Sequence, residues 1–266
     1  MSDTMMDLTL PQRLPLQGKR GLVVGIANAE SIAHGCGQAF RAMGAELAIT
    51  YLSEKAKPYV EPIATELGAD LFLPCDVREE GQLEAVFAEI ERKWGRLDFL
   101  LHSIAFAPRL DLHGRVTDCS REGFAIAMDV SCHSFIRMAR LAEPLMTEGG
   151  TLLTMSFYGA EKVIEHYNLM GPVKAALEAT VRALAVELGP KGIRVHAVSP
   201  GPIATRAASG IDRFDALMNR AAERAPAHKL VTIADVGWAT ACLCTDYARM
   251  VTGETIHIDG GYHILG

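Results

Sequence analysis

The sequence predicts an α/β fold in which one doubly wound parallel sheet forms a single domain. Strand-like apolar runs alternate with amphipathic helical patterns along the chain. The strand-like runs are continuously apolar, which is typical of strands buried on both faces of a sheet. We find no short-period repeat, low-complexity tract or linker-like stretch, so the 266 residues are expected to form one large domain.

The first half of the chain is expected to contain four strands, each followed by a helix. The expected strands cover residues 20–25, 46–51, 70–75 and 97–103. The expected helices cover residues 31–43, 54–67, 79–94 and 120–146. Ser120 is expected to cap the last of these helices, because a serine oxygen can accept a hydrogen bond from a free N–H group of the first turn.

The second half continues this pattern with three further strands. They are expected at residues 151–156, 193–199 and 254–259, with helices at residues 167–188 and 232–246. Gly189-Pro190 is expected to end the helix at 167–188, because glycine suits the residue after a helix and proline cannot continue it. Repeated β–α–β units predict a parallel sheet with helices on both faces and right-handed crossovers.

Two segments stand outside this pattern. Residues 1–16 are expected to be a loose N-terminal tail, and residues 17–266 are expected to form the folded domain. The segment at about 200–224 begins with Pro200-Gly201-Pro202, is rich in small residues and follows the end of a strand. Since ligands of a doubly wound sheet bind beyond the carboxyl ends of its strands, this segment is expected to hold one or two short helices and to form a substrate loop.

Composition and charge exclude several classes of protein. Hydrophobic residues make up 49% and charged residues 22% of the chain, as in ordinary globular proteins. A net charge of −6 without a basic patch favours neither a nucleic-acid partner nor a membrane partner. Six scattered cysteines and nine histidines lack metal-ligand spacing, so we expect no metal, and free thiols suit the cytoplasm. We find neither an apolar run long enough to span a membrane nor a signal-peptide pattern.

Tyr167 and Lys174 are the most informative pair of side chains. In a helix, residues seven apart differ by about 20° in direction and lie about 10.5 Å apart along the axis, so the two would share one face. A lysine so placed can lower the pKa of the phenol and hold a sugar hydroxyl, which suits enolate or alkoxide chemistry beside a nicotinamide ribose. The alternative is a partly exposed pair on an amphipathic helix.

Three strand ends before this pair have features of a nucleotide site. Gly25 allows a tight turn where backbone N–H groups can approach a pyrophosphate, although the glycine spacing is not G-x-G-x-x-G. Asp76 could accept a hydrogen bond from an adenine amino group, or cap a helix. Ser103 and Ile104 follow the fourth strand, where small residues leave room for ribose. The second strand ends without an arginine for a 2′-phosphate, which favours NADH over NADPH.

The chain resembles the short-chain dehydrogenase/reductase superfamily and, within it, the bacterial NADH-linked enoyl-acyl-carrier-protein reductases of the divergent type. The spacing of Tyr167 and Lys174 is the sharpest likeness, because ordinary carbonyl-reducing members have Tyr-x3-Lys. The matching strings run in family order and are Gly25…Ser31-Ile32-Ala33…Gly35, Cys75-Asp76-Val77, His102-Ser103-Ile104-Ala105-Phe106-Ala107-Pro108, Gly159-Ala160-Glu161-Lys162, Tyr167-Asn168-Leu169-Met170-Gly171…Lys174, Gly201-Pro202-Ile203…Thr205 and Gly253-Glu254…His257…Asp259-Gly260-Gly261.

This resemblance implies a Rossmann-like dinucleotide-binding domain that reduces trans-2-enoyl thioesters on acyl carrier protein with NADH, in fatty acid biosynthesis. It also implies a homotetramer in the cytoplasm. By resemblance the catalytic residues are Tyr167 and Lys174. The implied cofactor-binding residues are Gly25, Ser31, Ile32, Asp76, Val77, Ser103, Ile104, Lys174, Ile203, Ala204, Thr205, Arg206 and Ala207, and the expected substrate contacts are Ala107, Phe157 and Tyr158.

The sequence departs from the family pattern at three places, one of which is Leu52 in place of a polar residue, and it leaves two other functions open. Phe157 stands where the family often has a second tyrosine, and the adjacent Tyr158 could either reach the substrate or pack in the core. Pro200 replaces a common alanine. One alternative is another superfamily reductase, acting on a carbonyl or a coenzyme A-linked enoyl compound; a carbonyl reductase would need a hydroxyl near Thr154. The other is a dinucleotide-binding paralogue without activity.

Overall fold

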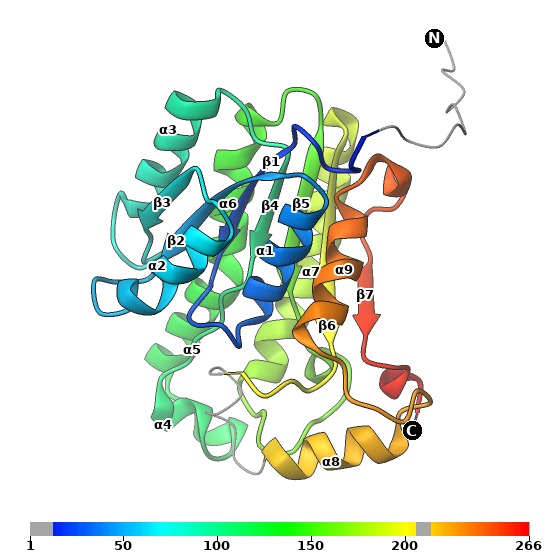
Figure 1. Cartoon of the computed structure of the whole chain (residues 1–266). Helices are drawn as coiled ribbons and strands as arrows, with labels where there is room; N and C mark the ends of the chain where they lie inside the picture. Colours follow the sequence, from blue (N-terminus) through cyan, green and yellow to red (C-terminus); the bar gives the residue numbers. More distant parts are fainter. Residues whose placement is uncertain (1–12, 206–213, 266) are drawn as a thin grey trace.

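A computed structural model of the chain describes residues 13–205 and 214–265. Within them, seven parallel strands form one sheet in the order β3-β2-β1-β4-β5-β6-β7 (Figure 1). The strand order reverses between β1 and β4, so the predicted doubly wound fold is confirmed. The strands are β1 (Arg20–Val24), β2 (Glu46–Tyr51), β3 (Leu71–Pro74), β4 (Phe99–His102), β5 (Gly150–Met155), β6 (Ile193–Pro200) and β7 (Thr255–Ile258).

Helices cover both faces of this sheet. One face packs against α1, α2 and α9, and the other against α3, α6 and α7. The remaining helices, α4, α5 and α8, gather at the end of the sheet toward which the strand arrows point (Figure 1). The helices are α1 (Ile32–Ala42), α2 (Lys57–Glu66), α3 (Gln82–Trp94), α4 (Arg109–Leu112), α5 (Arg121–Met128), α6 (Ser134–Ala142), α7 (Met170–Leu188), α8 (Phe214–Arg224) and α9 (Ile233–Leu243).

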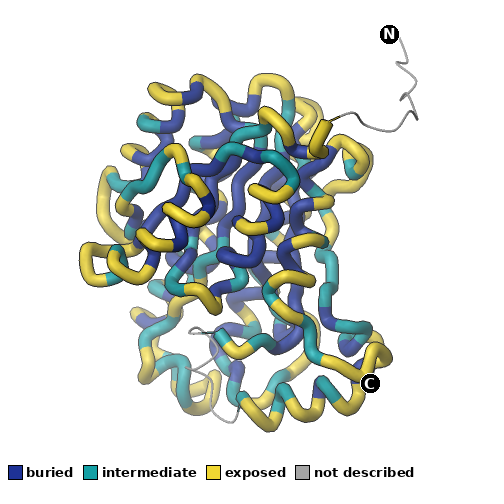
Figure 2. The backbone as a smooth tube through the Cα atoms, in the orientation of Figure 1, coloured by how far each residue is buried: buried dark blue, intermediate teal, exposed yellow. Residues whose placement is uncertain are grey.

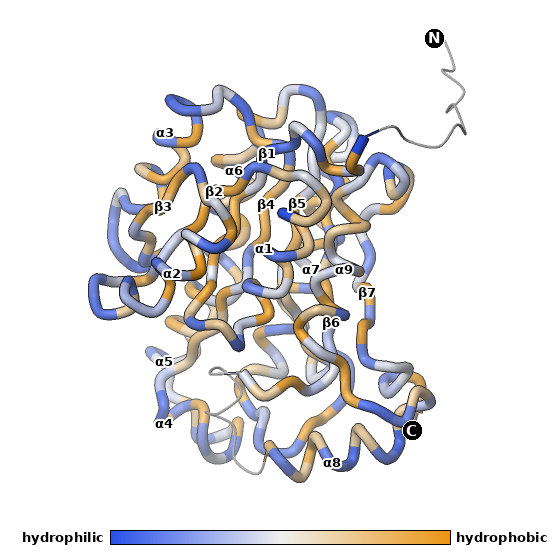
Figure 3. The backbone as a smooth tube through the Cα atoms, viewed as in Figure 1, coloured by the Kyte–Doolittle hydropathy of each residue, from blue (hydrophilic) through white to orange (hydrophobic). Residues whose placement is uncertain are grey.

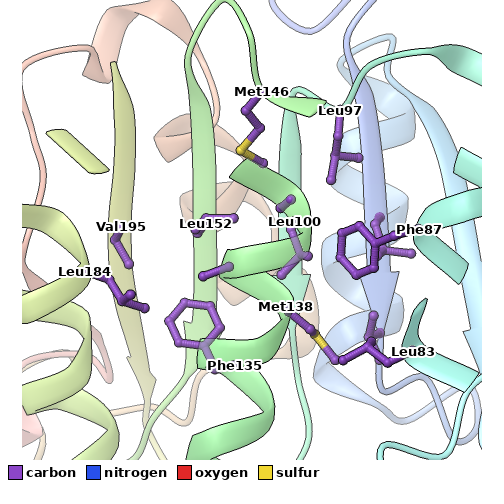
Figure 4. Packing of buried hydrophobic residues seen from close by; sticks show 14 of the residues in the cluster. Leu83, Phe87, Leu97, Leu100, Phe135, Met138, Met146, Leu152, Leu184 and Val195 are labelled. Carbon is purple, nitrogen blue, oxygen red and sulfur yellow. The ribbon is translucent and has the colours of Figure 1, made fainter. Parts of the chain in front are cut away.

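The continuous apolar runs of the strands follow from this layered arrangement. Leu22 and Val24 of β1 face the layer of α3, α6 and α7, whereas Val23 between them faces the opposite layer. On the first side, Phe135 and Met138 of α6 lie over the central strands (Figure 4). Buried residues fill the centre and exposed ones the outer helix faces, and hydrophobic residues are prominent in the central strands (Figures 2 and 3).

The predicted helix at 120–146 is interrupted. Ser120 caps α5 as expected, accepting a hydrogen bond of 2.9 Å from the Gly123 N–H. A π-helical turn at Asp129–His133 then separates α5 from α6. Within this turn the Ser131 hydroxyl accepts from the Phe106 N–H at 2.9 Å and donates to its carbonyl at 3.1 Å, which anchors the segment after β4. Such turns often occur beside functional sites.

A buried histidine links β4, β5 and α6. The ring of His102 lies 2.8 Å from the Thr154 hydroxyl through Nδ1 and 2.8 Å from the Ser134 hydroxyl through Nε2. Ser134 donates its one hydroxyl hydrogen to the Val130 carbonyl, so it must accept from Nε2–H, and Nδ1 must accept from Thr154. Burial, helped by the nearby Lys174, lowers the pKa of His102 to about 3, so the ring is neutral near neutral pH.

The structure describes the predicted N-terminal tail and substrate loop only in part. Residues 1–12 of the expected tail lie outside the described residues, while Leu16 is fully buried and its N–H donates to the Met43 carbonyl at 2.9 Å. The helix expected between residues 200 and 224 is present as α8. Among the described residues, no helix combines the length and apolarity needed to cross a membrane.

Helices α1 and α9 approach each other through two glycines. A Cβ at Gly35 would lie 2.3 Å from the carbonyl oxygen of Ile233, and a Cβ at Gly237 would lie 2.2 Å from the carbonyl oxygen of Gly35. Any larger residue would therefore force the two backbones apart. This contact matters for the site because α1 starts at its edge.

We expect Gly35→Ala to lower the free energy of unfolding by about 1–3 kcal/mol, because the added methyl group meets backbone that cannot move aside. Gly37→Ala on the same helix is the matched control: its Cβ would meet only the flexible end of Leu67, at 2.9 Å. Both variants gain about 1 kcal/mol of helix propensity. Urea unfolding measures the difference, and equal midpoints for the two variants would contradict a tight α1–α9 contact.

Candidate active site

A cavity of about 340 Å³ opens at the carboxyl ends of the strands. It lies where a doubly wound sheet binds its ligands. Its walls are mainly apolar, with a few hydroxyl groups and one ammonium group. The predicted site residues that the structure brings to these walls are Ile32, Ser103, Ile104, Ala107, Phe157, Tyr167, Lys174, Ile203 and Thr205.

Tyr167 reaches this cavity from a turn and not from the helix that was predicted to carry it. Helix α7 begins at Met170, so the shared helical face calculated for Tyr167 and Lys174 was wrong. The residues on either side of the tyrosine, His166 and Asn168, both have left-handed backbone conformations, with φ of 66° and 40°. These conformations are rare for non-glycine residues, and they turn the chain so that both side chains still face one cavity.

The ring of Tyr167 is held between two neighbours from the segment after β5. Phe157 lies edge-on to it, with ring centroids 4.9 Å apart. On another side the ring covers Gly159, where a Cβ would come within 2.4 Å of a ring atom. A side chain at Gly159 would therefore displace the tyrosine. The phenol is 7% exposed, so its position is set by packing as well as by the turn.

Burial keeps the Tyr167 phenol protonated. Desolvation raises its pKa above the ordinary value of 10.0, and the negative charge of Glu178 raises it further. The expectation that Lys174 lowers this pKa was wrong, because the cost of burying a phenolate dominates. Near neutral pH the phenol is a hydrogen-bond donor.

Lys174 places an ammonium group at the floor of the cavity. The residue lies in α7, is 4% exposed, and its Nζ donates to the Met155 carbonyl at the end of β5 over 2.6 Å. Burial lowers its pKa to about 8, so the group is mostly charged at neutral pH. An ammonium group has three hydrogens, and this bond uses one of them, which leaves donors for sugar hydroxyls.

Two hydroxyl groups before Tyr167 have other partners. Ser156 lines the cavity but donates to the carboxylate of Glu178 at 2.5 Å, and burial raises the pKa of that carboxyl group. Thr154, the position a carbonyl reductase would need, is fully buried and bonded to His102. The hydroxyl expected for carbonyl reduction is thus absent from the cavity wall, which argues against that alternative.

Sequence reasoning missed Glu178. Its only sequence signal is a carboxylate four residues after Lys174, one helical turn along α7. A charge at that spacing is usual on exposed helix faces, and the buried Ser156 partner comes from a distant segment of the sequence.

The loop between β1 and α1 is shaped for close backbone contact. Gly25 has φ of 111°, and a Cβ there would lie 2.0 Å from the Ser103 carbonyl oxygen. The Ser31 hydroxyl accepts from the N–H groups of Ala27 and Asn28, at 3.0 and 3.1 Å, so it holds the loop in place. Helix α1 then begins at Ile32, on the cavity wall. The positive end of the helix dipole at this point suits a pyrophosphate.

The remaining predicted residues are distributed around this site. Asp76 and Val77 follow β3; Val77 is buried, and its carbonyl accepts from Arg137 at 2.7 Å. Tyr158 does not line the cavity and packs against Tyr262, with ring centroids 5.8 Å apart, so its position favours the core role over substrate contact. Ala204 lies in the same strand-end segment as Ile203.

Two expected cofactor contacts, Arg206 and Ala207, lie outside the described residues. Among the residues that are described, no group of three or more histidine, cysteine, aspartate or glutamate side chains could hold a metal ion.

The donors at this site fit a dinucleotide. The N-terminus of α1 and the buried ammonium of Lys174 both reach the cavity wall, beside small or apolar side chains that leave space for flat rings. The geometry therefore combines a protonated phenol, an ammonium group and an anion-binding helix end in one crevice.

Comparison with known proteins agrees with this geometry. Residues 25–263 match the family described as Enoyl-(Acyl carrier protein) reductase. The chain is 48% identical over 251 residues to enoyl-(acyl-carrier-protein) reductase (NADH) 1 of Rhizobium meliloti, covering 94% of this chain and 92% of the relative. It is 46% identical over 250 residues to the corresponding NADH enzyme of Escherichia coli, covering 94% and 95%.

A solved structure shows the same fold. The enoyl-(acyl-carrier-protein) reductase of Anaplasma phagocytophilum, in complex with NAD, superposes with a TM-score of 0.92 at 46% identity, covering 97% of this chain and 98% of that one. Since the family match spans most of the sequence, the chain belongs to the enoyl-(acyl carrier protein) reductase family.

Proposed function

We propose that this protein reduces the carbon–carbon double bond of trans-2-enoyl thioesters carried on acyl carrier protein, using NADH, in fatty acid biosynthesis. The observation that carries this proposal is the shared cavity of Tyr167 and Lys174, one a buried neutral donor and the other a buried cation. The bound nicotinamide would supply a hydride to the β-carbon of the substrate.

Tyr167 acts where negative charge develops. Hydride addition moves charge to the thioester oxygen, and the protonated phenol donates a hydrogen bond to that oxygen. A donor placed at such an oxyanion typically contributes about 2.7–4 kcal/mol to transition-state stabilisation. Phe157 and Gly159 hold the ring in position, so little reorganisation is needed during the reaction. The α-carbon then takes a proton from Tyr167 or from solvent.

Lys174 binds the nicotinamide ribose and orients it. Its Nζ is fixed by the Met155 carbonyl and directs its other hydrogens to the ribose hydroxyls, while its charge favours the developing enolate. Gly25, Ser31 and Ile32 would surround the pyrophosphate, with Ser31 acting through the loop it holds. Asp76 and Val77 would hold adenine, Ser103 and Ile104 the ribose, Ile203 to Ala207 the nicotinamide side, and Ala107 and Phe157 the substrate.

NADH is preferred over NADPH in this proposal. The curated relatives of Rhizobium meliloti and Escherichia coli are named for NADH, whereas a Bacillus cereus relative of known structure, 44% identical with a TM-score of 0.93, contains NADP+. Leu52 directly after β2 is exposed and offers no charge to a 2′-phosphate. The lysines Lys55 and Lys57 come later, and Nζ of Lys57 lies 5.5 Å from the centroid of the Tyr51 ring.

We also propose that the protein acts in the cytoplasm as a homotetramer. The six cysteines form no disulfide, which suits a reducing compartment. Apolar side chains on α5 and α6, Phe124 at 45% and Ile136 at 38% exposure, are available for contact between copies of the chain.

We expect Tyr167→Phe to lower kcat for a crotonyl thioester of acyl carrier protein by about 10²–10³-fold, because the oxyanion loses its donor. The Kd for NADH should stay within about twofold of wild type, since Lys174 holds the cofactor. Loss of reduced-nicotinamide absorbance measures turnover, with a simple ketone as the competing substrate. Tyr59→Phe, on an exposed tyrosine of α2, is the matched control. Unchanged turnover in Tyr167→Phe would refute the assigned role.

We expect the affinity for NADH to fall as pH rises above about 8, because deprotonation of Lys174 removes the charge and a hydrogen that the cofactor needs. The Kd should rise by up to about tenfold per pH unit there and should be nearly constant below that pH. Lys174→Met should bind weakly with a flat profile, whereas Lys93→Met on α3 should behave as wild type. A wild-type profile in Lys174→Met would exclude this lysine as the titrating group.

A further inference from the structure

Asp76 is held by the arginine two residues after it. Arg78 donates through Nε to Oδ1 at 3.1 Å, through Nη2 to Oδ2 at 2.7 Å, and through its backbone N–H to Oδ1 at 3.0 Å. The Asp76 N–H in turn donates to Oε1 of Gln82 at 2.8 Å. These hydrogen bonds fix the orientation of the aspartate side chain, and 13% of its surface stays exposed.

Arg78 also connects this carboxylate to the cavity. Its guanidinium carbon lies 5.5 Å from the centroid of the Phe106 ring, within the range of a cation–π contact. Phe106 lines the cavity and is anchored by Ser131. The contact therefore joins the segment after β3, which holds Asp76, to the segment after β4, which lines the cavity.

The position along the sheet matches the adenosine end of a dinucleotide. Such ligands lie across the crevice where the strand order reverses, here between β1 and β4. Lys174 contacts the end of β5, on one side of this point. Asp76 follows β3, on the other side. With the nicotinamide ribose at Lys174, the adenine half extends toward Asp76.

The hydrogen-bonding capacity of Asp76 limits what it can recognise. An ionised carboxylate offers about four lone-pair positions, and Arg78 occupies three of them, two on Oδ1 and one on Oδ2. Asp76 is ionised near neutral pH and therefore only accepts, and the side-chain hydrogen bonds from Arg78 lower its pKa further below the ordinary value of 3.8. The remaining acceptor position, on Oδ2, therefore selects a ligand edge that donates.

We propose that Arg78 is a positioning residue that makes Asp76 select a 6-amino purine over a 6-oxo purine at the adenosine end of the cofactor. An amino group donates to Oδ2, whereas a 6-oxo group would place its oxygen against the carboxylate. This inference rests on the proposed use of NADH. Without Arg78, Asp76 is still an acceptor but can rotate, so its free acceptor position is no longer held in one place.

The test compares the Kd of NADH with that of reduced nicotinamide hypoxanthine dinucleotide, which differs only in its 6-oxo purine, by fluorescence titration. Wild-type protein should prefer NADH by about tenfold or more. Arg78→Met should reduce this preference to within about threefold. Arg78→Lys, which keeps the charge but not the fork, should lie between them. Arg92→Met is the matched control, since Arg92 grips Glu89 through the same atoms on the exposed face of α3.

The results of this titration test the role of Arg78 separately from the proposed function. A wild-type preference that narrows in Arg78→Met, with unchanged thermal unfolding, supports the proposal. An unchanged preference for NADH in Arg78→Met overturns this inference and leaves the proposed function intact. The same holds if wild-type protein shows no preference for NADH but still oxidises it with a crotonyl thioester. Failure of wild-type protein to bind NADH overturns both.

Discussion

The hydrogen bond from Lys174 to the Met155 carbonyl ties helix α7 to the end of the central strand β5. The active site depends on it because it fixes a cation at the carboxyl end of β5, beside the point between β1 and β4 where the strand order reverses. The same bond holds the first part of α7 against the end of β5, and the turn carrying Tyr167 comes directly before that helix. This contact positions the ammonium group, while the turn, Phe157 and Gly159 position the phenol beside it.

Burial gives these groups their chemical character. In water a lysine is far more basic and a tyrosine is free to rotate. Inside this cavity, desolvation brings Lys174 close to its titration range and holds Tyr167 in its neutral form. The free energy needed to bury both groups must come from the apolar packing of the sheet and helices around them, most of which lies away from the site.

Local sequence patterns predicted the fold correctly but did not predict the geometry of the active site. Continuous apolar runs such as that of β1 identify buried strands, because each residue faces one of two covered layers. The start of α7 was missed because the left-handed residues His166 and Asn168 have no reliable signal in a single sequence. The π-helical turn before α6 was missed for a related reason: its anchor, the contact between Ser131 and Phe106, joins distant segments. Arg78 was not among the predicted site residues, because its contact with Phe106 joins segments that are distant in the sequence.

Burial of the neutral His102 ring lowers the stability of the folded protein at acidic pH. Its pKa is about 3 in the folded protein against an ordinary value of 6.5, so between these values an unfolded chain takes up a proton that the native state refuses. His196, with a pKa lowered to about 4 by burial and by Arg194, adds to the same imbalance. The free energy of unfolding therefore falls as pH drops below about 6.5, because both imidazoles are neutral in the folded sheet and take up protons when it unfolds.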